Sequence, residues 1–162
     1  MIFHKHLLIN AKVEKPMKTE GQAMAFLEKL VDRINMKIIK GPFASYVDKP
    51  GNRGLTAIVM IETSHIAFHI WDEEDPGLMQ FDLYTCGELN LPQVLLALGE
   101  DFNIISMEYN LFDREKGFVL EDSGHYPEIW KNSHFTKIWI FFWDVRYGFK
   151  KIKNKKNSEH TT

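Results

Sequence analysis

Two stretches of apolar residues at helical spacing predict two helices. The first begins at Thr19, because Thr19 and Gln22 have the spacing of a capping box. The apolar residues of this helix recur every three or four positions and form one face. They are Ala23, Phe26, Leu27, Leu30, Val31 and Ile34. The second helix is predicted over Leu91–Leu98, with Asn90 as its N-cap and Gly99 as its C-terminal stop.

Shorter apolar or alternating runs around these helices predict strands. Each run has the length of a strand and is bounded by turn residues. The predicted strands are Leu7–Val13, Lys37–Val47, Leu55–Glu62, His65–Trp71, Leu78–Cys86 and Ile105–Leu111. Gly41-Pro42 interrupts the second strand, which favours an edge position or a bulge, since proline cannot donate a ladder hydrogen bond.

The order strand, helix, strands, helix, strand favours an α+β fold over residues 1–117: an antiparallel sheet with both helices on one face, a two-layer sandwich. After Gly117 the pattern changes, and large apolar residues occupy every second position, as on a strand with one apolar face. They are Trp139, Phe141, Trp143, Val145, Tyr147 and Phe149. We therefore predict an aromatic-rich extension over residues 118–149, packed on the core or on a dimer interface. Residues 150–162 are predicted to be a disordered basic tail.

Composition narrows the possible classes of protein. A chain of 162 residues with 44% hydrophobic residues can fill the core of one domain. Its formal charge of −2 gives no general attraction to nucleic acid or to a membrane surface, so neither is expected as a partner. The longest apolar run, Ile138–Trp143, is too short for a spanning helix, and the N-terminus lacks a signal-peptide pattern. The single cysteine, Cys86, cannot form an internal disulfide, which favours a cytoplasmic protein with a free thiol.

The segment from Ser64 to Cys86 concentrates reactive groups: a hydroxyl, two imidazoles, a carboxylate and the only thiol. A serine hydroxyl can attack the preceding carbonyl, and the resulting ester can eliminate to a dehydroalanine that hydrolyses to a pyruvoyl group. This chemistry needs a hydroxyl at the break, a proton-transfer group and strained backbone. Ser64 supplies the hydroxyl, and His69 or His65 the proton transfer, because imidazole titrates near neutral pH.

Strand alternation places a condition on this chemistry. It puts His65, His69 and Trp71 on one face of a strand and points Ser64 away from His69. We therefore predict a bulge or sharp turn at Thr63-Ser64 that brings the hydroxyl and the imidazole together. Such irregularities are frequent next to active sites.

The string IETSHIAFHIWDE…FDLYTCGE resembles the core of the prokaryotic S-adenosylmethionine decarboxylase proenzymes, within a weaker similarity over residues 6–117. The resemblance implies cleavage between Thr63 and Ser64, with Ser64 converted into a covalent pyruvoyl cofactor. Such a group forms a Schiff base with the substrate amine and accepts electrons as carbon dioxide leaves. The substrate implied is S-adenosylmethionine, decarboxylated to the aminopropyl donor for spermidine synthesis.

The resemblance also assigns roles to individual residues. His69 resembles the histidine that assists processing, and Thr56 occupies the place of a serine that does the same. Cys86 resembles the proton donor of the decarboxylation.

On the substrate side, Glu73 is expected to hold the ribose hydroxyls, in a Trp71-Asp72-Glu73 segment that stands for the family's Trp-Pro-Glu. Tyr46 is the nearest match to the aromatic residue that stacks on adenine. We group Trp71 and His65 with these substrate-binding residues. The resemblance further implies a homodimer with a four-layer αββα arrangement and active sites near its interface.

Two other functions remain open. Altered loops at residues 46–54 and 73–81 favour a pyruvoyl-dependent decarboxylase of a basic amino acid, such as ornithine or arginine. Thr63, where close relatives usually carry glutamate, favours an unprocessed homologue that acts as a binding partner. A metal site on the two histidines would need a third ligand, and we expect none.

Overall fold

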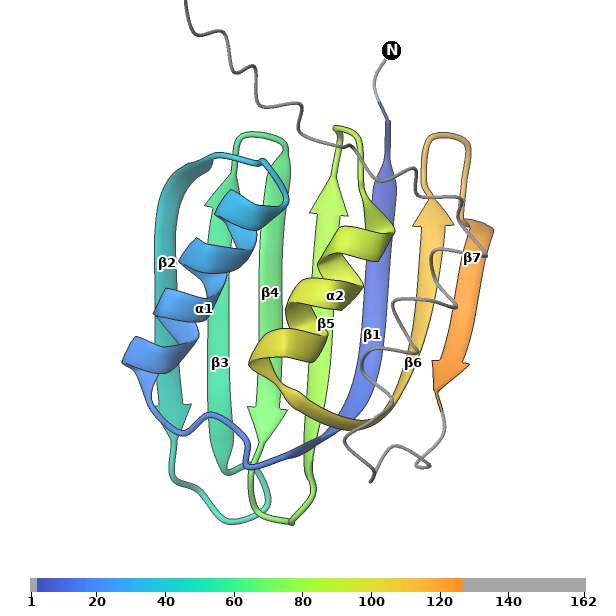
Figure 1. The fold of residues 1–162 in the computed structure, drawn as a ribbon. Helices are drawn as coiled ribbons and strands as arrows, with labels where there is room; N and C mark the ends of the chain where they lie inside the picture. The colour runs from blue at the N-terminus through green and yellow to red at the C-terminus, as the bar shows by residue number, and fades with distance from the viewer. Residues whose placement is uncertain (1–2, 127–162) are drawn as a thin grey trace, which may run out of the picture. The chain divides into compact units, whose positions relative to one another are not determined.

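The structure is a computed structural model that describes residues 3–126. Its elements are β1 (Lys5–Glu14), α1 (Glu20–Arg33), β2 (Ile38–Val47), β3 (Gly54–Ile61), β4 (Ser64–Trp71), β5 (Gly77–Thr85), α2 (Leu91–Asp101), β6 (Asn103–Asp113) and β7 (Val119–Tyr126). The strands of this region form one antiparallel sheet in the order β2-β3-β4-β5-β1-β6-β7, with both helices on the same face (Figure 1). The predicted α+β fold with helices on one face is confirmed.

The core lies between the sheet and the helices because each central strand alternates buried and exposed residues. In β1, for example, Leu7 and Ile9 are buried whereas Leu8 between them is exposed. Phe26 of α1 packs edge-on against Phe68 of β4 and Phe102 after α2, with ring centroids 5.4 and 4.8 Å away. Burying side chains of this size contributes roughly 1.5–3 kcal/mol each, so this face holds the helices in place.

The opposite face of the sheet, called the open face below, carries the other half of each strand. Register shows which side chains share a row across it. His65 pairs with Tyr84, and Tyr84 pairs with His6 on the far side of β5. One row away, Ala67 pairs with Asp82. Strand order therefore brings residues from β4, β5 and β1 together, although they are far apart in the sequence.

Both predicted N-caps are confirmed. The hydroxyl of Thr19 accepts the amide hydrogen of Gln22 at 3.3 Å, and the side-chain oxygen of Asn90 accepts that of Gln93 at 3.2 Å. Such caps satisfy backbone donors that have no partner inside the helix. No helix in residues 3–126 is long and apolar enough to cross a membrane.

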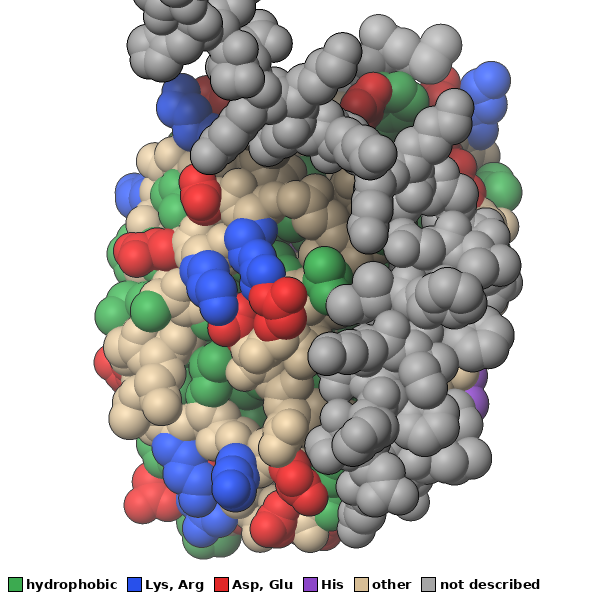
Figure 2. Space-filling model, in the orientation of Figure 1, with side chains coloured by type: hydrophobic (Ala, Val, Ile, Leu, Met, Phe, Trp, Pro, Cys, Tyr) green, Lys and Arg blue, Asp and Glu red, His purple; other side chains and the backbone are tan. Residues whose placement is uncertain are grey.

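The predicted stop at Gly99 is wrong, since α2 continues to Asp101. Two ion pairs accompany the longer helix. The added turn places Asp101 beside Lys29 of α1, with nitrogen and oxygen 2.5 Å apart, and pairs Glu100 with Arg33. Figure 2 shows basic and acidic side chains side by side on this helical face.

The two edges of the sheet differ in how well the sequence predicted them. β2 is an edge strand with register shifts around Gly41-Pro42, as predicted. At the other edge β7 pairs with β6, and no strand was predicted there. β7 covers the start of the extension predicted over residues 118–149. The remainder of that extension and the predicted tail, residues 127–162, lie outside the described residues.

Two glycine-to-alanine exchanges test the contact between β3 and β4 and the length of α2. They are expected to change the stability of the fold in opposite directions. A Cβ at Gly54 would lie 2.0 Å from the carbonyl oxygen of Ile70, so Gly54→Ala is expected to separate β3 from β4 and destabilise the fold. A Cβ at Gly99 meets nothing within 4 Å, and Gly99→Ala should raise the free energy of unfolding by about 0.5–1 kcal/mol. Urea unfolding followed by circular dichroism measures both changes. A less stable Gly99→Ala protein would contradict a helix through residue 99.

Candidate active site

The turn between β3 and β4 presents Ser64 in strained backbone. Ile61 pairs with Ser64 across a tight turn formed by Glu62 and Thr63. The φ angle of Ser64 is +147°, a value that residues with a Cβ rarely adopt. Such conformations cost on the order of 1–3 kcal/mol and concentrate at functional sites. The sharp turn predicted at Thr63-Ser64 is confirmed.

The carbonyl that precedes Ser64 is hydrogen-bonded by the end of β5. The Thr63 carbonyl oxygen accepts the amide hydrogen of Cys86 at 2.9 Å, and the Cys86 carbonyl accepts that of Phe3 at 3.2 Å. Cys86 is a free, exposed cysteine. The structure therefore brings Ser64 and Cys86 to the same end of the sheet. A backbone N–H at this oxygen is placed to stabilise negative charge if the carbonyl is attacked.

A chain of polar contacts leads from Ser64 across three strands of the open face. Ser64 Oγ lies 3.1 Å from Nδ1 of His65, and Nε2 of His65 lies 3.2 Å from Oδ1 of Asp82. On the other side of β5, Oδ2 of Asp82 lies 2.9 Å from Nε2 of His6. Arg114, just after β6, reaches Nδ1 of His6 at 3.2 Å. We call these five residues the Ser64–Arg114 chain.

Sequence reasoning did not select three members of this chain, namely His6, Asp82 and Arg114, as site residues. Alternation placed Asp82 on a face with Tyr84, but nothing local indicated that β1 lies next to β5. Tyr84 stands between the two histidines, with ring centroids 5.6 Å from His6 and 6.1 Å from His65. The Arg114 guanidinium lies over the Tyr84 ring at 4.7 Å, a cation–π distance.

Within one polypeptide, His69 lies away from Ser64. His69 is five positions further along the strand, which is about 16 Å at the rise of an extended strand. His69 Nδ1 lies 2.5 Å from the hydroxyl of Thr56, and its ring lies 3.9 Å from the Trp71 ring. The expectation that the turn brings Ser64 to His69 is therefore wrong within one chain. The turn changes the direction of the Ser64 side chain. The distance from Ser64 to His69 stays long because Ser64 pairs with Ile61 and His69 pairs with Thr56, five positions away on β3.

Burial gives His69 a distinct electrostatic character. Desolvation lowers the pKa of the imidazole below its ordinary value of 6.5, which favours the neutral ring at neutral pH. Its Nε2 is buried with no hydrogen-bond partner in the described part of the chain. A hollow of about 450 Å³ on the open face is lined by His69 and Thr56 at one side and by Asp82 at the other. The two groups of polar residues therefore border the same space.

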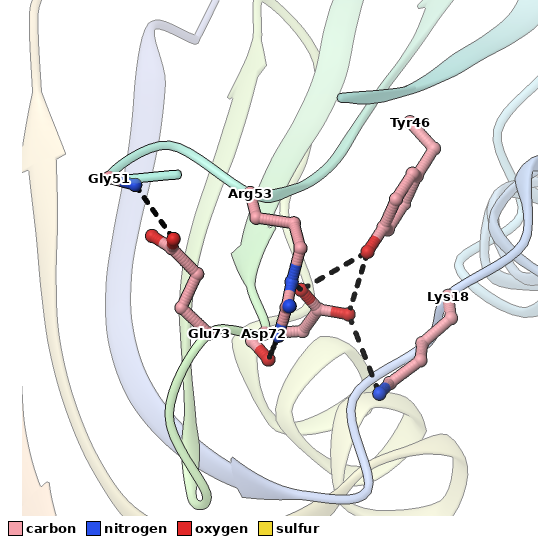
Figure 3. A network of polar contacts seen from close by, with 6 residues as sticks. All are labelled: Lys18, Tyr46, Gly51, Arg53, Asp72 and Glu73. Atoms are coloured by element: carbon pink, nitrogen blue, oxygen red, sulfur yellow. Dashed lines mark hydrogen bonds and ion pairs between the residues drawn. The ribbon is translucent and has the colours of Figure 1, made fainter. Parts of the chain in front are cut away.

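A second polar network ties the loops at the far end of β4, and Figure 3 shows it from close by. The buried carboxylate of Asp72 accepts a hydrogen bond from Arg53 Nε at 2.9 Å and one from the Tyr46 hydroxyl at 3.1 Å. Lys18 Nζ lies 3.7 Å from the same carboxylate. Burial alone would raise the pKa of Asp72, but the hydrogen bonds from Arg53 and Tyr46 outweigh it and hold the pKa below the ordinary value.

Three of the predicted substrate-binding residues, Tyr46, Trp71 and Glu73, lie in or beside this network. Tyr46 pairs with the buried Leu55, so it faces the helices, whereas Trp71 lies on the open face with its indole N–H donating to Asn52 at 3.1 Å. Glu73 accepts the amide hydrogen of Gly51 at 2.7 Å (Figure 3). Because β4 runs from Ser64 to Trp71, Glu73 lies more than roughly 23 Å along the strand from Ser64. The structure does not bring Tyr46 or Glu73 to Ser64 within one chain.

Apolar side chains are exposed on the open face around both polar groups. Phe43 is 55% exposed and Met60 is 45% exposed. The exposed apolar residues of this face include Leu8, Phe43, Val47, Ile58, Met60 and Leu78. Exposed apolar side chains that gather on one face indicate an interaction surface.

A strained serine beside a histidine and a free cysteine, on an α+β sandwich, matches the design of a self-processing enzyme. The chain belongs to the S-adenosylmethionine decarboxylase family, whose model matches residues 5–115. It is 26% identical over 117 residues to an S-adenosylmethionine decarboxylase proenzyme of Archaeoglobus fulgidus, covering 70% of this chain and 99% of that protein.

Other relatives match shorter segments. A protein of the same description from Pyrococcus furiosus is 40% identical over 50 residues, which is 31% of this chain and 34% of the relative. One from Methanococcus aeolicus is 29% identical over 69 residues, covering 43% of this chain and 56% of the relative. Strand β7 lies beyond the residues that the family model matches.

Replacing the buried carboxylate tests the Asp72 network. Asp72→Asn should lower the free energy of unfolding at pH 7 by about 2 kcal/mol, because the hydrogen bonds from Arg53 and Tyr46 lose their charged acceptor. The folded-state pKa of Asp72 is depressed, so its stabilisation is present above the ordinary value of 3.8 and is lost as the pH falls through the folded value. The difference between variant and wild type should therefore shrink below pH 3.8 in urea unfolding.

The control for this test is Glu74→Gln, an exposed carboxylate two residues further along the same loop. It should change stability by less than about 0.5 kcal/mol at either pH. Equal losses in Asp72→Asn and Glu74→Gln would contradict the network.

Proposed function

We propose that this protein is a self-processing, pyruvoyl-dependent decarboxylase of S-adenosylmethionine that supplies the aminopropyl donor for spermidine synthesis. The observation that carries the proposal is the bond between Thr63 and Ser64. Its backbone is strained, its carbonyl oxygen accepts a hydrogen bond from Cys86, and the Ser64 hydroxyl contacts His65. Membership of the family supports the same reaction.

The residues around Ser64 fit a pyruvoyl group. It would be held at the start of β4, where Ser64 pairs with Ile61 on one side and Thr85 on the other. When bound, it supplies a carbonyl that accepts electrons as carbon dioxide leaves the substrate. Cys86 presents an exposed thiol at the adjacent strand end and is the proposed donor of the proton that replaces the carboxylate. A thiol stays reduced in the cytoplasm, where we place the reaction.

The hollow on the open face is the proposed substrate site. Its volume of about 450 Å³ lies within the roughly 300–1,000 Å³ range of small-molecule pockets. Thr56 and His69 border it, and the indole ring of Trp71 lies against the His69 ring. An aromatic ring stacks on a nucleobase, which supports a nucleoside substrate.

We further propose that two copies pair through their open faces and form a four-layer αββα homodimer. The exposed apolar residues of that face support this pairing, since a dimer would bury them. If the strands of the two copies run in opposite directions, the Ser64 end of one copy lies over the His69 and Trp71 end of the other. The separation of Ser64 from His69 and Glu73 within one chain supports an active site shared between copies.

Cleavage is tested by intact-mass analysis of the purified protein. We expect fragments of residues 1–63 and 64–162, the second beginning with a pyruvoyl group, and an intact chain for Ser64→Ala. Release of carbon dioxide should then be faster from S-adenosylmethionine than from ornithine or arginine. A wild-type chain that stays whole during long incubation would rule out the proposed function.

Mixing two inactive variants tests the shared site. His69→Ala retains Ser64, and Ser64→Ala retains His69, so a mixed dimer rebuilds one complete site. We expect the His69→Ala chain to be cleaved after co-expression with Ser64→Ala but to be cleaved slowly alone. The two chains differ in mass, so mass spectrometry identifies which of them is cut. An equally slow His69→Ala chain in the mixture would place His69 in its own chain's reaction or in none.

A further inference from the structure

We infer that His65 is the base that activates the Ser64 hydroxyl, and that Asp82, His6 and Arg114 hold His65 in the protonation form this requires. This inference rests on the proposed self-cleavage before Ser64. It assigns that step to the Ser64–Arg114 chain, in which each residue lies within hydrogen-bond distance of the next and all five belong to one polypeptide.

The directions of the hydrogen bonds in the Ser64–Arg114 chain follow from two groups of fixed character, the Arg114 guanidinium and the Asp82 carboxylate. A guanidinium only donates, so Nδ1 of His6 must accept, and a neutral His6 then carries its proton on Nε2. That proton points to Oδ2 of Asp82 at 2.9 Å. A carboxylate only accepts, so Nε2 of His65 donates to Oδ1 at 3.2 Å.

The Ser64 end of the chain then has the arrangement of a general base. Since the proton of a neutral His65 is on Nε2, its Nδ1 carries a lone pair, and the Ser64 hydroxyl 3.1 Å away donates to it. Asp82 thus selects the tautomer of His65, as the aspartate does in a serine–histidine–aspartate triad, but with the two ring nitrogens exchanged. The distance is within the reach of proton transfer.

The strands and their side chains hold this arrangement. Asp82 lies diagonally between His65 and His6 because both histidines pair with Tyr84, two residues further along β5. The Tyr84 ring contacts both imidazoles, and Arg114 covers the ring from outside. The side chain of His6 is 15% exposed and that of Asp82 is 35% exposed, so the bond between them is partly shielded from water.

The reaction balances with the groups at hand. Ser64 Oγ forms a bond to the Thr63 carbonyl carbon as its proton passes to His65 Nδ1, and the carbonyl oxygen becomes negative while hydrogen-bonded by the Cys86 amide. The bond from that carbon to the Ser64 nitrogen then breaks, and the nitrogen takes the proton from His65. The product is an ester with a free amine, and His65 is neutral again.

The later steps need only water from solvent. Water takes the Ser64 α-proton, the bond from Cβ to the ester oxygen breaks, and the Thr63 carboxylate leaves with its electron pair, which gives a dehydroalanine. Its imine form adds water and releases ammonia to give the pyruvoyl group. The proposed assistance by His69 would come from a second copy.

The test follows the appearance of fragment 64–162 by intact mass, in full-length protein made by cell-free translation. His65→Ala and Asp82→Asn should each slow cleavage by roughly 10²–10⁴-fold, the range for a lost base or a wrong tautomer. Because Asp82 acts through His65, the double variant should be no slower than His65→Ala alone. Added imidazole should restore part of the rate in His65→Ala, which also shows that this variant is folded.

The matched control is Asp101→Asn, the same exchange on the helical face, which should cleave at the wild-type rate. A second measurement avoids cleavage altogether. In Ser64→Ala, ¹⁵N NMR shifts should show the Nε2–H tautomer for both His65 and His6, and Asp82→Asn in that background should change the tautomer of at least one.

The inference would be overturned, with the proposed function left intact, by Asp82→Asn cleaving at the wild-type rate or by His65 carrying its proton on Nδ1. Additive losses in the double variant would also overturn it, because they would give Asp82 a role separate from His65. Failure of the proposed function would instead be seen in the wild type, as an absence of cleavage.

Discussion

The double pairing of β5 is the constraint on which the site depends. Its hydrogen bonds to β4 on one side and to β1 on the other set Asp82 diagonally between His65 and His6. The same ladders bring the Cys86 amide to the Thr63 carbonyl at the end of the strand. A slip of one residue in either pairing would move these side chains to the helical face, because side-chain direction alternates along a strand. Backbone register, rather than side-chain affinity, therefore assembles the site.

Because both helices pack on one face, the two faces of the sheet carry different kinds of side chain. The helical face holds the aromatic cluster around Phe26 and, at one end, the buried Asp72 with Tyr46 and Arg53. The open face carries the histidines together with exposed apolar residues such as Phe43. Stability and chemistry are thus assigned to opposite faces. If two copies pair through the open face, as proposed, assembly and catalysis are linked.

Local sequence signals predicted the helices, strands and turns well, but they did not predict which of these elements lie next to one another. The caps at Thr19 and Asn90 and the turn at Ser64 are set by residues close in sequence, so they were predictable. The extent of α2 past Gly99 depends on Phe102 reaching the aromatic cluster, which is a tertiary contact. The role of Asp82 depends on β1 inserting beside β5, which no local pattern encodes. Strand alternation predicted that Ser64 and His69 point to opposite faces. It did not indicate that His65 would be the imidazole next to Ser64.

The strand order has a consequence for the protein after cleavage. A cut before Ser64 assigns β1, β2 and β3 to one fragment and β4 onward to the other. Because β1 lies between β5 and β6, the fragments are interleaved: the first contributes a strand to the middle of the second. They cannot part by opening a hinge, only by unzipping two ladders and the β3–β4 ladder together. The processed protein would then unfold as a heterodimer does, with a midpoint that rises with concentration. If His6 and Asp82 act as inferred, the sheet must close before the cut, because the two side chains meet only once β1 is in place.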